Sequence, residues 1–87
     1  MNDAWRLVLD EDAFQFVLTR RARERQVLFK ALESLRADPY QPPDFELADR
    51  TGRTLSVRRA RPFLLTYWLD ASITEIRIVN VELVATT

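Results

Sequence analysis

The stretch Phe63-Leu64-Leu65-Thr66-Tyr67-Trp68-Leu69 decides the fold of this chain. Its residues are apolar at nearly every position and rich in aromatic side chains, which favours a strand that is apolar on both faces. We therefore expect it to be the central strand of a sheet. Alternation along a strand places Tyr67 and Trp68 on opposite faces, and large aromatic side chains in a small domain usually contribute to the core.

A turn and a long strand follow this segment. The turn is Asp70-Ala71-Ser72, and the residues Ile73–Leu83 then alternate in the manner of a strand. The alternation predicts one face with Ile76 and Ile78, and a second face with Arg77, Val79 and Val81. A cross-strand ion pair is the expected role of Arg77, because aliphatic residues surround it.

A hairpin precedes the central strand. Phe45–Leu47 and Thr54–Arg58 flank the turn Ala48–Arg53, in which Gly52 can adopt the positive φ that closes a hairpin. Alternation places Arg58 opposite the face that carries Leu55 and Val57, whereas Arg59 points with the apolar side and is expected to pair with Asp70 or Glu75.

The first half of the chain predicts a strand and two helices. Trp5–Leu9 alternates weakly, and three acids follow it, as suits the positive end of a helix dipole. A short helix should then bury one stripe, formed by Ala13, Phe14, Val17 and Leu18. Thr19 can cap a second helix, which Asp38-Pro39 ends because the residue before proline is pushed out of the α region. Its buried face should carry Val27, Leu28, Ala31, Leu32 and Leu35. The order β-α-α-β-β-β follows.

Length and composition limit the classes of protein. At 87 residues the chain fits a single domain, 1–87, because a second core needs roughly another 50 residues. It contains no cysteine and no histidine, so we expect no metal site, no cofactor and no imidazole catalysis. No signal-peptide pattern and no membrane-spanning apolar run are present, which predicts a cytoplasmic protein.

Charge is distributed unevenly although the formal net charge is zero. Five arginines and no acid occur between Arg50 and Leu69, so the rest of the chain carries −5. Arginine is suited to planar contacts with phosphate or carboxylate, and Arg53, Arg58 and Arg61 are our candidates for such contacts. Trp68 is a candidate for base stacking. The alternative is a solvated edge strand, in which charges only prevent aggregation.

The element order, the motif Asp49-Arg50-Thr51-Gly52-Arg53 and the strand end Tyr67-Trp68-Leu69-Asp70 resemble the RelE/ParE toxin superfamily of bacterial toxin–antitoxin systems over nearly the whole chain. The resemblance implies an α+β fold, with two N-terminal helices packed on a curved antiparallel sheet. It also implies growth inhibition, a role in plasmid stabilisation and a cognate antitoxin as partner. Possible targets are the ribosome with its messenger RNA, to which RNA binding would belong, or DNA gyrase. The resemblance also leaves open that the chain forms a homodimer.

Two positions depart from the ribonucleases of this superfamily. Those proteins have an arginine in the central strand where this chain has Leu64, and an arginine, histidine or tyrosine near the C-terminus, where this chain reads Val84-Ala85-Thr86-Thr87. Cleavage also needs a base, which arginine cannot supply because it stays charged. The candidates are Asp49, Asp70, Glu75, Glu82 or an adjusted tyrosine, and no motif marks one of them.

Three functions remain open. The first is a toxin-like protein that binds an antitoxin and acts on translation or on a protein target without obvious catalytic residues. The second is a messenger RNA endoribonuclease with a rearranged site, in which Arg58, Arg61 and a carboxylate such as Asp70 would act. The third is a non-toxic binding module of the same fold. The missing residues and the zero net charge favour a protein that is not an enzyme.

Overall fold

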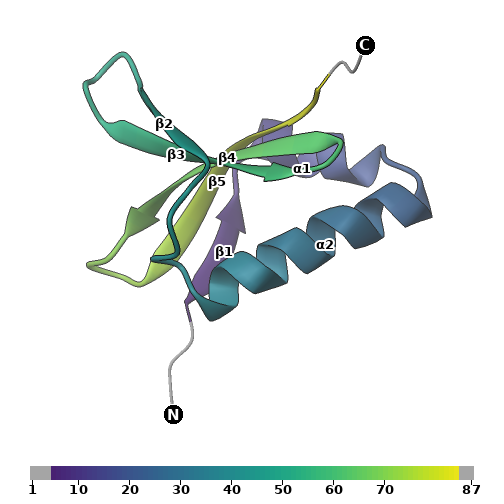
Figure 1. Cartoon of the computed structure of the whole chain (residues 1–87), viewed down its shortest axis with the longest axis horizontal. Helices are drawn as coiled ribbons and strands as arrows, with labels where there is room; N and C mark the ends of the chain where they lie inside the picture. Colours follow the sequence, from purple (N-terminus) through teal and green to yellow (C-terminus); the bar gives the residue numbers. More distant parts are fainter. Residues whose placement is uncertain (1–4, 85–87) are drawn as a thin grey trace.

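The computed structural model describes residues 5–84 as one mixed sheet with two helices. Both helices lie on the same side of the sheet (Figure 1). The strand order is β1-β5-β4-β3-β2. The elements along the chain are β1 (Arg6–Leu9), α1 (Glu11–Leu18), α2 (Ala22–Ala37), β2 (Phe45–Ala48), β3 (Thr54–Ala60), β4 (Phe63–Asp70) and β5 (Glu75–Leu83). The predicted α+β class and the packing of two helices on the sheet are confirmed.

The strand pairing refines the predicted topology in two ways. β4 is central as predicted, and it pairs antiparallel with β3 and β5. β1 lies parallel to β5, however, so the sheet is mixed. These two strands are the first and the last of the chain, and no hairpin between them fixes their relative direction. The short strand β2, which forms the hairpin with β3, is a fifth strand beyond the order β-α-α-β-β-β.

A β-bulge in β5 corrects the predicted faces of the last strand. Thr66 pairs with Asn80, but Tyr67 pairs with Ile78, so Val79 is left without a partner on β4. The extra residue reverses the alternation of all residues that follow. Val81 therefore lies in the core with Ile78, and its predicted place on the face of Arg77 is wrong.

The helix boundaries also differ in part from the prediction. α2 begins at Ala22, and Thr19 ends α1 instead of capping α2, because its hydroxyl donates to the carbonyl of Phe16 at 2.8 Å. α2 ends at Ala37, as the proline at position 39 predicts. Neither helix in residues 5–84 is long and apolar enough to cross a bilayer.

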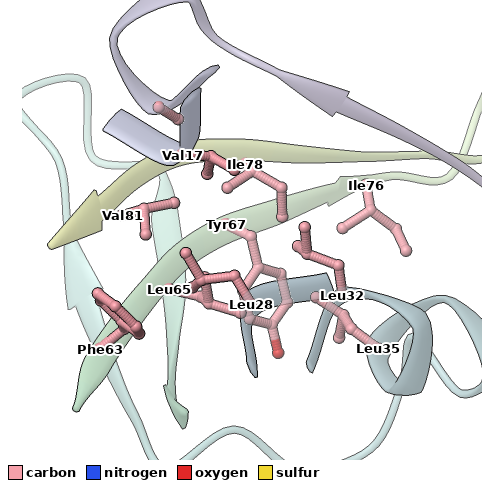
Figure 2. Packing of buried hydrophobic residues seen from close by; sticks show 11 residues of the cluster. Val17, Leu28, Leu32, Leu35, Phe63, Leu65, Tyr67, Ile76, Ile78 and Val81 are labelled. Carbon is pink, nitrogen blue, oxygen red and sulfur yellow. The ribbon is translucent and has the colours of Figure 1, made fainter. Parts of the chain in front are cut away.

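The core lies between the helices and one face of the sheet. Leu28, Leu32 and Leu35 of α2 pack against side chains of β4 and β5, and Figure 2 shows Leu65 and Tyr67 pointing from β4 toward α2. Burial raises the pKa of the Tyr67 hydroxyl. Only half of the predicted α1 stripe is buried, since Phe14 and Leu18 remain 48% and 52% exposed.

We call the opposite side of the sheet, which neither helix covers, the open face. Its side chains alternate with those of the core along each strand. Val57 and Thr66 pair across β3 and β4 in its middle and are buried there by their neighbours. The register places these residues on the open face: Phe45, Leu47, Leu55, Val57, Arg59, Leu64, Thr66, Trp68, Glu75, Arg77, Asn80 and Glu82. Arg53, which precedes β3, joins this face because it lies over the ring of Trp68.

Candidate functional site

At the β1–β5 end of the open face, arginines are neutralised by carboxylates. Glu75 is buried and accepts hydrogen bonds from Arg6 at 2.6 Å and from Arg77 at 3.2 Å. The bond from Arg6 is the main reason why the pKa of Glu75 is lowered. Arg77 also lies 3.9 Å from Asp10, which directly follows the neighbouring strand β1. Arg77 therefore takes part in ion pairs as predicted, but the shorter one, to Glu75, lies within β5 and not across strands. These arginines have structural partners and are not free for a ligand.

The β3–β4 end of the open face is different. Arg53, Arg59 and Arg61 form no ion pair with any carboxylate in residues 5–84. All three belong to the stretch from Arg50 to Leu69, which contains no acid. This stretch forms β3 and most of β4, so these two strands supply almost no carboxylate near the three arginines. This end is therefore the part of the open face that can attract an anionic ligand.

Arg53 is stacked on Trp68 at the start of β3. Its guanidinium carbon lies 4.1 Å from the centroid of the Trp68 ring, within cation–π range. The turn before it is rigid because Asp49 accepts bonds from the backbone N–H groups of Thr51 and Arg53, and Gly52 has the predicted positive φ of 86°. Trp68 is half-buried on the open face, whereas Tyr67 is in the core, as their opposite directions require.

Arg59 and Arg61 line a pocket around Leu64 at the other end of β4. Leu64 pairs directly with Arg59 across β3 and β4, and the pocket encloses about 380 Å³. The N–H of Val84 donates to the carbonyl of Pro62 at 2.8 Å and holds the end of β5 against the β3–β4 turn. We call this hollow the Leu64 pocket; its lining residues are Phe45, Arg59, Arg61, Pro62, Phe63, Leu64 and Val84.

The structure does not bring the three candidate catalytic residues together. Arg58 lies on the helix side of β3, as alternation predicts, and donates to the carbonyl of Pro42 at 3.2 Å. Arg61 lies at the β3–β4 turn. Asp70 lies at the far end of β4, where it accepts a bond from the Ser72 hydroxyl at 2.7 Å. Asp70 lies six residue steps along β4 from Leu64, which is about 20 Å.

Arg59 is the site residue that the sequence analysis did not select. Its predicted partner Glu75 is held by Arg6 and Arg77, and no ion pair to Asp70 forms, so the predicted pairing is wrong. Its backbone N–H donates to the carboxylate of Asp44 at 2.6 Å, while its side chain lines the Leu64 pocket. The even spacing of six residues between Arg53 and Arg59 contained this information, since residues an even number apart along an extended segment share a face.

Two of the candidate carboxylates, Asp49 and Glu75, are poorly suited to act as a general base. A hydrogen bond from the Thr51 hydroxyl lowers the pKa of Asp49, and that of Glu75 is lowered by Arg6; a lowered pKa makes a weaker base. Glu82 lies across from Leu64 on β5 and accepts a bond from Asn80 at 3.2 Å. No three acidic residues within 5–84 are grouped to hold a metal ion.

A second surface lies on the helix side of the molecule, next to the edge strand β1. A groove of about 300 Å³ runs between β1, α1 and α2. Phe14, Leu18 and Phe29 line it and are each about half exposed. We call this groove the helix groove; it is apolar apart from Arg25 and Glu33, and its chemistry suits a protein segment with apolar side chains.

Solved structures share this architecture. The RelE–RelB complex from the archaeon Pyrococcus horikoshii OT3 contains a chain that matches with a TM-score of 0.74, over 95% of this chain and 98% of the other, at 11% sequence identity. The chain has the RelE fold. Isolated Escherichia coli RelE toxin matches with a TM-score of 0.67, over 97% of this chain and 88% of the other, at 17% identity.

A third match with the RelE fold comes from the intact E. coli RelBE toxin–antitoxin complex, with a TM-score of 0.63, 17% identity, and coverage of 97% of this chain and 100% of the other. A scan against protein-family models gives no match, and a search of the curated proteins gives none. The likeness therefore lies in the fold, while the side chains of the Leu64 pocket must be interpreted from their own chemistry.

Proposed function

We propose that this chain is the toxin-like member of a toxin–antitoxin pair, that it binds an antitoxin, and that it acts on translation or on a protein target by binding. The observation that carries the proposal is the match of the RelE fold over 95% or more of the chain, including matches to two complexes with RelB. Action on translation would place the protein in the cytoplasm.

The exposed apolar side chains of the helix groove support an antitoxin partner. Phe14, Leu18 and Phe29 are large, about half exposed and adjacent in one groove. Contiguous apolar surface on a small protein is typical of a binding site, and an amphipathic helix or an extended segment could cover it. Because the groove and the arginines lie on opposite sides of the sheet, an antitoxin that hides both must wrap around the molecule.

The composition of the open face favours binding over cleavage. Leu64 stands where the resemblance leads us to expect an arginine, and it cannot offset charge on a phosphorane. Asp49 and Glu75 have lowered pKa values and structural partners. The formal net charge of zero supplies no overall field that would attract RNA.

One observation favours cleavage of messenger RNA as a second candidate function. Arg59 and Glu82 lie directly on either side of Leu64 on the same face of the sheet. In such a rearranged site, the Glu82 carboxylate would take the proton of a 2′-hydroxyl, while Arg59 and Arg61 would stabilise the charge that develops on the phosphate. This arrangement would replace the predicted set of Arg58, Arg61 and Asp70.

Growth after induced expression of the chain in a bacterial host tests the proposal, with messenger RNA followed by primer extension. We expect arrest with intact messages, and co-expression with a cognate antitoxin, sought among the adjacent genes, should relieve it. Arrest with new cleavage sites would overturn action by binding and establish the second candidate. Absence of arrest would leave a non-toxic binding module and contradict the toxin proposal.

Three variants separate these outcomes. Glu82→Gln should leave arrest unchanged if the protein acts by binding, and should abolish it if Glu82 is a general base. Arg59→Gln combined with Arg61→Gln should weaken arrest in either case when the Leu64 pocket contacts the target. Arg21→Gln is the matched control, because Arg21 is exposed at the start of α2, far from the open face. If growth stops while the messenger RNA stays intact, a supercoiling assay tests whether DNA gyrase is the target.

A further inference from the structure

We infer that the Leu64 pocket is a binding site for an acidic protein segment, which inserts one aromatic or branched aliphatic side chain between Arg59 and Arg61 and places carboxylates on their guanidinium groups. The inference rests on the proposed function, because the segment would belong to the antitoxin. It assigns a specific chemistry to a site that the RelE fold by itself does not define.

The lining of the pocket argues for an apolar side chain. Five of its seven lining residues are Phe45, Pro62, Phe63, Leu64 and Val84, and the two others are arginines at its rim. Its volume of about 380 Å³ lies at the small end of the range of about 300–1,000 Å³ that is usual for ligand sites. The space is therefore suited to one large side chain with its flanking backbone.

The two arginines argue for carboxylates next to that side chain. Neither Arg59 nor Arg61 has an ion pair with a carboxylate in residues 5–84, whereas Arg6 and Arg77 at the other end of the open face do. The carboxylate of Asp44 accepts the backbone N–H of Arg59 at 2.6 Å but forms no ion pair with its guanidinium. A planar guanidinium without a partner binds a carboxylate in two-point contact, which makes an acidic segment the complementary ligand.

A phosphodiester is the less suitable ligand for the same pocket. RNA binding draws mainly on neutralisation of many phosphates, and the chain has a formal net charge of zero. The apolar side chains of Leu64, Phe45 and Val84 offer no hydrogen-bond donor to a phosphate at the centre of the pocket. RNA is therefore the alternative occupant that the experiment has to distinguish.

The test is nuclear magnetic resonance titration of the full chain, labelled with nitrogen-15 and made by cell-free synthesis. The probe is a blocked five-residue peptide with a central phenylalanine and two acidic residues on each side. We expect shifts of the backbone amides of Arg61, Leu64 and Val84, and no shift of Phe14 and Leu18 in the helix groove. Replacing the central phenylalanine by serine should weaken binding at least about tenfold.

Variants of the chain complete the test. Arg59→Gln with Arg61→Gln should weaken the peptide about tenfold or more, since two charge-assisted contacts are lost. Leu64→Trp should fill the pocket and abolish binding without changing any charge, and its amide spectrum reports whether it folds. Arg21→Gln with Arg23→Gln removes two exposed arginines elsewhere and should leave the affinity unchanged.

Several results would overturn the inference. They are the absence of shifts at millimolar peptide, equal binding of the serine peptide, shifts confined to the helix groove, and tighter binding of a single-stranded RNA of similar length at the same amides. The growth experiment is independent of the peptide and RNA titrations. Growth arrest without peptide binding would reject the inference and leave the proposed function, whereas peptide binding without arrest would reject only the proposed function.

Discussion

The two faces of β4 differ although their residues alternate in one strand. Phe63, Leu65 and Tyr67 point to the helices and are at most 1% exposed, and the core packs around them. Leu64 and Trp68 point to the open face and remain partly exposed beside arginines. A strand that is apolar on both faces therefore does not need helices on both faces. One apolar face packs against the helices, and the other remains partly exposed.

The open face is itself divided by charge pairing. Glu75 and Asp10 neutralise Arg6 and Arg77 at one end, while the arginines near Leu64 have no carboxylate partner in residues 5–84. The formal net charge of zero does not distinguish one arginine from another. The ion pairs show which arginines lack a carboxylate partner within residues 5–84.

The largest expected effect is a difference in the free energy of unfolding between variants of two neighbouring leucines. Leu65→Ala removes a fully buried side chain from the core and should lower the free energy of unfolding by about 2–5 kcal/mol. Leu64→Ala removes a partly exposed side chain from the open face and should cost about 1 kcal/mol or less. Urea unfolding followed by circular dichroism measures both. Equal losses would show that the open face is as important for stability as the core.

A smaller effect concerns the paired end of the open face. The pKa of Glu75 is lowered from its ordinary value of 4.5, so its ion pairs stabilise the fold above about pH 4.5, and this stabilisation is lost as the pH falls through the lowered pKa. Glu75→Gln should therefore be less stable than the parent protein at pH 7, and the difference should shrink toward pH 3. Urea unfolding at several pH values checks this.

Glu33→Gln is the control for that experiment. Glu33 is exposed and pairs with Arg36 within α2 at 2.9 Å, so its removal should cost only about 0.2–0.5 kcal/mol. A difference between Glu75→Gln and the parent protein that stays constant from pH 7 to pH 3 would contradict the role given to Glu75.

The smallest effect concerns Arg53 on Trp68. Arg53→Gln removes a cation–π contact and should cost about 0.5–1 kcal/mol. It should also shift the fluorescence of Trp68 to longer wavelength, since water replaces the guanidinium over the ring. A Trp5→Phe background isolates the signal, and Arg50→Gln in the same turn is the control. If Arg53→Gln and Arg50→Gln give the same spectrum, the stacking does not persist in solution.

Much of the fold was predictable because its signals are local. The apolar run that became β4, the stop before Pro39 and the positive φ of Gly52 each depend on a few neighbouring residues. The register was not predictable, because the bulge at Val79 inserts one residue without a mark in the apolar pattern. The candidate site was predicted only in part: Arg53, Arg61 and Trp68 lie on the open side, but Arg58 does not, and Arg59 was overlooked.

The sequence by itself determined which segments form strands and helices, that Tyr67 and Trp68 face opposite ways, and that the free positive charge lies between Arg50 and Leu69. These properties follow from side-chain period, backbone preference and composition. Only the tertiary structure decided that β1 runs parallel to β5, that Glu75 pairs with Arg6 and Arg77, and that Arg59 meets Leu64 and Val84 in one pocket. Those outcomes depend on which distant strands become neighbours, and local patterns do not specify that choice.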